Sequence, residues 1–127
     1  GASGSFELAG SGWNAMLAAN GFDAGLQTYL VVDNTNGNTV VGAAAQEVIW
    51  IKNTGKKLST ATHGGTATTS DGTTANDIKV YYSATLLTVL SPGEGILFKD
   101  HDGALAGQNF KVESSGTDKV LVERLAI

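Results

Sequence analysis

Short runs in which β-branched and aromatic residues mix with polar ones follow one another along the chain from about residue 26. The first run, "LQTYLVVD", has the composition of a β-strand. The pair Asn36-Gly37 in "NTNGN" favours a tight turn, and "TVVG" then resumes the strand pattern. The pattern therefore predicts a β-hairpin over residues 26–42.

The next run, "EVIWIKNTG", carries bulky apolar residues on both faces. Trp50 points to one side of a strand and Ile49 and Ile51 to the other, because successive side chains alternate. Bulk on both faces is typical of a strand in the interior of a sheet. We predict an inner strand with Trp50 in the core, ending at Asn53-Thr54-Gly55.

Four further runs of this kind follow, with turn residues between them: "IKVYYSATLLTVL", "GILFK", "FKVESS" and "KVLVERLAI". Strands at this spacing, without helices between them, are typical of an antiparallel sandwich or barrel. A chain of 127 residues suits one domain with its own core. We predict an all-β fold, an antiparallel β-sandwich over residues 26–127, with a jelly roll as one candidate topology.

The only proline of the chain lies between two of these runs, in "LLTVLSPGEGILFK". Proline cannot donate to a sheet ladder, and a glycine after it takes the positive φ that a type II turn requires. Pro92-Gly93 therefore predicts a turn over residues 91–94, with Leu90 and Ile96 on its flanks. Glu94 then stands at a strand start, where a solvated charge discourages edge pairing.

Residues 1–25 differ from the rest of the chain. Their first half is mostly Gly, Ala and Ser, with Phe6 and Leu8 between them, a composition that suits an extended arm lying against a neighbouring molecule. Trp13 opens "WNAMLAA", the one stretch that favours a short helix. We predict an N-terminal arm and name Phe6, Leu8 and Trp13 as candidate partner-binding residues.

A second candidate contact region is "STATHGGTATTSDGTTAND" at 59–77, which has almost no bulky apolar residue. A loop of this length is uncommon in a compact domain unless it is a functional projection, a flexible hairpin or a segment ordered by a partner. We predict that it contacts a partner, with His63 and Asp71 as candidate binding residues. No acidic residue is near His63 in sequence, which predicts a solvent-exposed imidazole.

Composition and charge exclude several classes. The chain has no cysteine, so it has neither a disulfide framework nor a thiolate zinc site. The net charge is −4 and the eight Lys and Arg residues are scattered, which disfavours nucleic acid as a ligand. No apolar run approaches the roughly 20 residues of a membrane span, so we expect no membrane partner.

Candidate catalytic and metal-binding patterns are weak. In "KDHDG", Asp100 and Asp102 alternate before Gly103, but an EF-hand loop from Asp100 needs Glu at its twelfth position, where Lys111 stands. An Asp-Gly turn explains the same residues. The chain also lacks a Gly-x-Ser-x-Gly elbow and a phosphate-binding loop. We therefore expect a protein that is not an enzyme and has no cofactor or metal.

Aromatic residues leave a carbohydrate-binding module as an alternative. An aromatic face accepts the apolar face of a pyranose, and Trp13, Trp50, Tyr81 and Tyr82 are the candidate platform. Tyr81 and Tyr82 point to opposite faces of a strand, so only one of them can join such a platform.

Three blocks resemble the small all-β virion structural proteins of tailed bacteriophages: "WIKNTG" at 50–55, "LSPGEGILF" at 90–98 and "FKVESSGTDKVLVE" at 110–123. "TYLVVDNTNGNTV" at 28–40 is similar to the first strand pair of phage head-decoration sandwiches. The long Thr-rich loop at 59–77 departs from this pattern.

The resemblance implies a decoration or cement protein on the capsid surface of a virion. Its partners would be the major capsid protein or other virion proteins, and such proteins often form symmetric trimers. A fibre or tail subunit is a further alternative.

Overall fold

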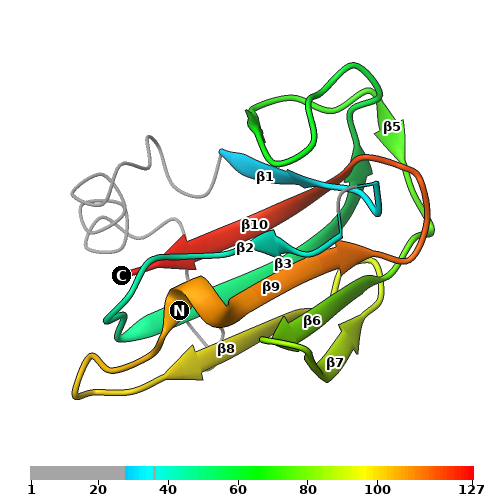
Figure 1. Ribbon diagram of the computed structural model, residues 1–127. Coiled ribbons are helices and arrows are strands. Elements are labelled where there is room, and N and C mark those ends of the chain that lie inside the picture. Colours follow the sequence, from blue (N-terminus) through cyan, green and yellow to red (C-terminus); the bar gives the residue numbers. More distant parts are fainter. Residues whose placement is uncertain (1–27, 36) are drawn as a thin grey trace, which may run out of the picture.

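The computed structural model describes residues 28–35 and 37–127. The arm, the short helix and the candidates Phe6, Leu8 and Trp13 lie outside the described residues. Two antiparallel sheets pack face to face (Figure 1), which confirms the predicted all-β sandwich.

Sheet A has six strands and sheet B has four. The order of sheet A is β4-β1-β10-β3-β5, with β8 beside β3, and that of sheet B is β2-β9-β6-β7. The strands of sheet A are β1 (Tyr29–Val32), β3 (Val48–Lys57), β4 (Thr66–Ala67), β5 (Gly72–Thr73), β8 (Gly95–Lys99) and β10 (Val120–Ala126). Those of sheet B are β2 (Thr39–Val40), β6 (Ile78–Tyr82), β7 (Thr85–Leu90) and β9 (Phe110–Ser114), the last preceded by the 3-10 turn η2 (Gly107–Asn109).

The core lies between the sheets and is built by alternate residues of each strand. Ile49 and Ile51 of β3 are fully buried, as are Ile78 and Val80 of β6 and Val112 of β9. Burying one such side chain stabilises the fold by about 1.5–3 kcal/mol. As predicted, β3 is an inner strand, with β10 on one side and β8 on the other.

Trp50 is not part of this core, so that prediction was wrong. It lies on the outer face of sheet A, because it alternates with the inward-facing Ile49 and Ile51. Its indole covers Gly95 of β8, and its Nε1 donates to Glu123 Oε2 at 3.3 Å. A strand pattern with bulk on both faces does not say which face meets the second sheet.

The predicted hairpin over residues 26–42 is also wrong. β1 pairs with β10 and β4 in sheet A, whereas β2 pairs with β9 in sheet B. The connection crosses from one sheet to the other, through a turn in which the Thr35 amide donates to Asp33 Oδ1 at 2.8 Å. Turn residues between two strands are compatible with both arrangements, and the pairing of β1 with β10, about 90 residues later in the chain, is not visible in the local sequence.

Strand β3 does not end at Asn53-Thr54-Gly55, as predicted, but continues to Lys57. The register against β10 shifts here, so this stretch is an irregularity within the strand. Gly55 takes a φ of +71°, and Thr54 Oγ1 donates to the Leu121 carbonyl at 2.6 Å.

The Pro-Gly corner is present as predicted and joins the two sheets. Gly93 has a φ of +91°, and the Glu94 amide donates to the Ser91 carbonyl at 2.9 Å. Sheet B ends on one side of the corner, at Leu90, and β8 of sheet A begins on the other. The corner is fastened to β3, because the Gly93 amide donates to the Asn53 carbonyl at 2.7 Å.

Candidate functional site

Loop 59–77 folds back onto sheet A (Figure 1, green). It contains β4, which pairs with β1, and β5, which pairs with the end of β3. A small apolar cluster lies beneath it: Val31 and Leu121 from the outer face of sheet A, with Ala67, Leu58 and Ala61. The packing of this loop was not predicted because its residues are small. The large side chains of the cluster come from the sheet.

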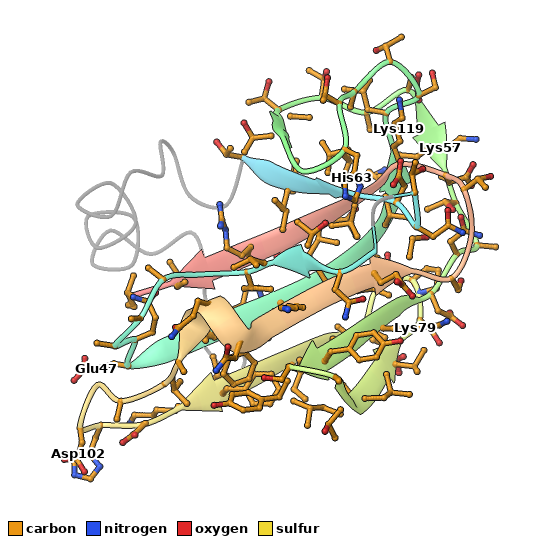
Figure 2. All side chains as sticks on the ribbon, in the orientation of Figure 1. Glu47, Lys57, His63, Lys79, Asp102 and Lys119 are labelled. Atoms are coloured by element: carbon orange, nitrogen blue, oxygen red, sulfur yellow. The ribbon has the colours of Figure 1, made fainter. Side chains whose placement is uncertain are left out.

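His63 is enclosed, so the prediction of a solvent-exposed imidazole was wrong. Its side chain is 14% exposed, and its Nδ1 lies 2.7 Å from Asp33 Oδ1. On the other side of the ring, Nε2 lies 3.2 Å from Thr39 Oγ1. Figure 2 shows His63 between the loop and β1. The acid comes from 30 residues earlier in the chain, which local sequence does not reveal.

The contacts of His63 have the order carboxylate, imidazole, hydroxyl that hydrolases use to activate a nucleophile. In a hydrolase the nucleophile faces a cleft that admits substrate. Here the imidazole is largely enclosed, and Asp33 also binds the Thr35 amide of the crossover turn. The role that this geometry supports is to fasten loop 59–77 to the β1–β2 connection.

Asp71 lies at the neck of the same loop but has different contacts from His63. Its side chain is exposed, and its two oxygens accept the Ser59 amide at 3.2 and 3.1 Å as well as the Ser59 hydroxyl. These hydrogen bonds, the hydroxyl's first, lower the pKa of Asp71 from its ordinary value. Asp71 and Ser59 thus close the loop at its base. The proposed partner-binding role of His63 and Asp71 stays a prediction.

The turn "KDHDG" gathers Asp100, His101 and Asp102 at the far tip of the molecule (Figure 2). Their ligand atoms lie within 4.8 Å of one another, and His101 and Asp102 are 84% and 75% exposed. The Asp102 amide donates to Asp100 Oδ1 at 3.0 Å, and Gly103 takes a φ of +69°. The turn chemistry predicted from sequence accounts for the arrangement, and in the described chain no fourth titratable ligand joins the three.

The aromatic residues with defined positions do not assemble into one flat platform. Trp50 is on the outer face of sheet A, and Tyr81 is on the outer face of sheet B, since it alternates with the buried Val80. Tyr82 meets Phe110 edge-on at 80°, and Phe98 meets Phe110 at 50°.

Strand β7 carries the largest group of exposed apolar side chains in the described structure. Leu86, Leu87 and Val89 are 50%, 44% and 43% exposed. β7 is the last strand of sheet B and pairs only with β6, so one side of its backbone is unpaired within the described chain. We call this side, with the three side chains, the β7 edge. This edge was not predicted from the sequence, although "TLLTVL" is uncharged and four of its six residues are apolar.

The other edge strands of the described chain are protected by means that natural sheets commonly use. β2, β4 and β5 are two residues long, and β8 ends in Lys99. Short edges and charged residues discourage pairing with another chain. The six-residue β7 has neither protection, and its Pro92 follows only after the strand has ended.

Comparisons with known proteins find no matching protein-family model, curated protein or solved structure. No helix in the described part of the chain has the length and apolar character of a membrane span.

Proposed function

We propose that this protein is a structural subunit that acts by association, as a decoration or cement protein on the head of a tailed bacteriophage. The observation that carries the proposal is the β7 edge. A six-residue, uncharged edge strand with three exposed apolar side chains promotes aggregation of an isolated protein. In an assembly that covers the strand, the same side chains are buried and stabilise the contact. The phage assignment rests on the sequence resemblance.

The three blocks that carry the resemblance contact one another in the folded chain. Asn53, in the first block, donates through Nδ2 to the Leu90 carbonyl of the second at 3.0 Å. Thr54 donates to the Leu121 carbonyl of the third at 2.6 Å. Residues that meet in one structural unit are expected to recur together, which supports treating the blocks as one pattern.

The mechanism requires no chemistry beyond binding. Each copy would add a modest contact between capsomers, and the repeating lattice would convert many weak contacts into strong attachment by avidity. The shell would then resist expansion or rupture although no single contact is strong.

The proposal is tested with purified phage heads assembled from the major capsid protein proposed as the partner of this chain. The full chain should cosediment with the heads at a fixed ratio to capsid protein and raise their rupture temperature. A chain without residues 1–12 should keep its folded circular dichroism spectrum and bind with lower occupancy. No binding by the full chain would refute the proposal, and equal occupancy after truncation would refute the role of the arm.

A further inference from the structure

We infer that the β7 edge pairs with the β7 edge of a second copy of this chain. The two strands would run antiparallel about a two-fold axis, which joins the four strands of each sheet B into one continuous eight-stranded sheet. The inference rests on the proposed function, in which the protein acts by association, and it names the partner of the exposed edge.

The exposed side chains of β7 select one register for such a pair. Leu86 pairs with Tyr81 and Val89 pairs with Lys79, both on the outer face of sheet B. They lie three residues apart yet share a face, because the β6–β7 register skips Leu87. An axis between Leu87 and Thr88 therefore places Leu86 of one copy opposite Val89 of the other. Exposed apolar residues meet, and they meet on the same face.

The charges on and beside β7 are compatible with pairing between two copies. β7 has no charged residue, so an antiparallel copy brings no like charges into opposition. In the adjacent strand, Lys79 opposes Val89, and its Nζ lies 3.9 Å from Glu113 Oε1 of β9. The Lys79 charge is thus already paired on the same sheet. A second copy therefore meets no repulsion between like charges at this edge.

The small size of the β7 edge sets the strength of the contact. A standard interface buries about 800 Å² per partner and uses 20–30 residues a side, whereas this one has a six-residue strand at its centre. The contact is therefore weak in dilute solution, with a Kd in the micromolar range or above. An isologous contact closes with two copies. The expected species is a dimer, unlike the trimer that the family resemblance implies.

Cross-linking tests the register directly, because the chain has no native cysteine. Leu86→Cys and Val89→Cys should form a disulfide-linked dimer when mixed and oxidised, since directly opposite residues in a sheet are within disulfide reach. Each variant alone should not cross-link, because its two cysteines would be about 10 Å apart along the strands. Val40→Cys, 45% exposed on β2, is the matched control. Equal cross-linking by every variant, or none in the mixture, would overturn the register.

Sedimentation velocity from about 1 µM to about 1 mM tests the interface itself. The native chain should shift from monomer to dimer, and Val89→Lys should weaken dimerisation at least tenfold while Val40→Lys leaves it unchanged. A native monomer at every concentration, or a trimer insensitive to Val89→Lys, would overturn the inference. Head binding by the native chain is scored separately, so a monomer that still binds heads refutes the β7 pairing and leaves the proposed function standing.

Discussion

Loop 59–77 has almost no bulky side chain, yet hydrogen bonds and two short strands tie it to the sandwich, whereas β7 is largely apolar and leaves three apolar side chains exposed. In Figure 1 β5 of the loop lies at the upper right and β7 at the lower right, and the end of the loop leads into β6, which pairs with β7. This contrast shows that the composition of a segment does not by itself predict whether its side chains are buried. The small residues of the loop pack against large side chains that sheet A supplies. The apolar residues of β7 stay exposed because β7 is the last described strand of sheet B.

Asn53 lies where the two regions meet, so its replacement should have the largest effect. It is fully buried, and its Nδ2 donates to the Asn76 carbonyl at the end of the loop and to the Leu90 carbonyl at the end of β7. Its Oδ1 accepts the Gly55 amide at 2.9 Å. Asn53→Ala leaves these buried groups without partners and should cost about 3 kcal/mol in urea unfolding. Loss below about 0.5 kcal/mol would show that the regions are held independently.

His63→Ala should have the next largest effect, because it detaches the loop from the β1–β2 connection. Removing the imidazole takes from the nearly buried Asp33 carboxylate its contact with Nδ1 at 2.7 Å and leaves it the Thr35 amide. The expected loss is about 2 kcal/mol in urea unfolding. The matched control is His101→Ala, at a site 84% exposed, which should be within about 0.5 kcal/mol of the native chain. Equal effects for the two histidines would contradict the fastening role.

Asp71→Asn should have a smaller and local effect at the neck of the loop. Hydrogen bonds from Ser59 lower the pKa of Asp71 in the folded chain, so its contribution is present above the unfolded pKa and is lost as pH falls through the folded pKa. The amide resonance of Ser59 should therefore move with pH below about 4 in the native chain and stay still in Asp71→Asn. Asp102→Asn should keep the native response, and a pH response that persists in Asp71→Asn would contradict the contact.

Val89→Thr should have the smallest effect on stability, because the side chain is already 43% exposed. We expect the free energy of unfolding of the monomer to change by less than about 0.5 kcal/mol. Its fully buried neighbour Val80 is the comparison, since Val80→Ala opens a cavity and should cost about 2 kcal/mol. A comparable loss at both positions would mean that β7 is covered in the monomer, which would remove the contrast between the two regions.

Much of the sandwich was predictable from local patterns. Alternation identified the longer strands, but residues 78–90, predicted as one run, form the two strands β6 and β7 with a turn at Ser83 between them. The single proline followed by glycine identified the corner between β7 and β8, because the constraints on φ and on the missing amide hydrogen are properties of the residues themselves. The Asp-Gly turn after Asp100 was predictable for the same reason. Of the candidate site residues, His63 and Asp71 were placed in the correct loop but without their contacts.

Local chemistry in the chain was therefore sufficient for strand positions, turn residues and the lack of thiol chemistry. Pairing was not encoded there. The β1–β2 turn suits a hairpin as well as a crossover, Trp50 suits either face of a sheet, and His63 has no acid nearby until β1 brings Asp33 to it. The same holds for β7, which has the pattern of an ordinary strand and is an edge because, among residues 28–35 and 37–127, only β6 pairs with it. Side-chain alternation is a property of neighbouring residues, whereas sheet order and the outward face depend on contacts between residues far apart in the chain.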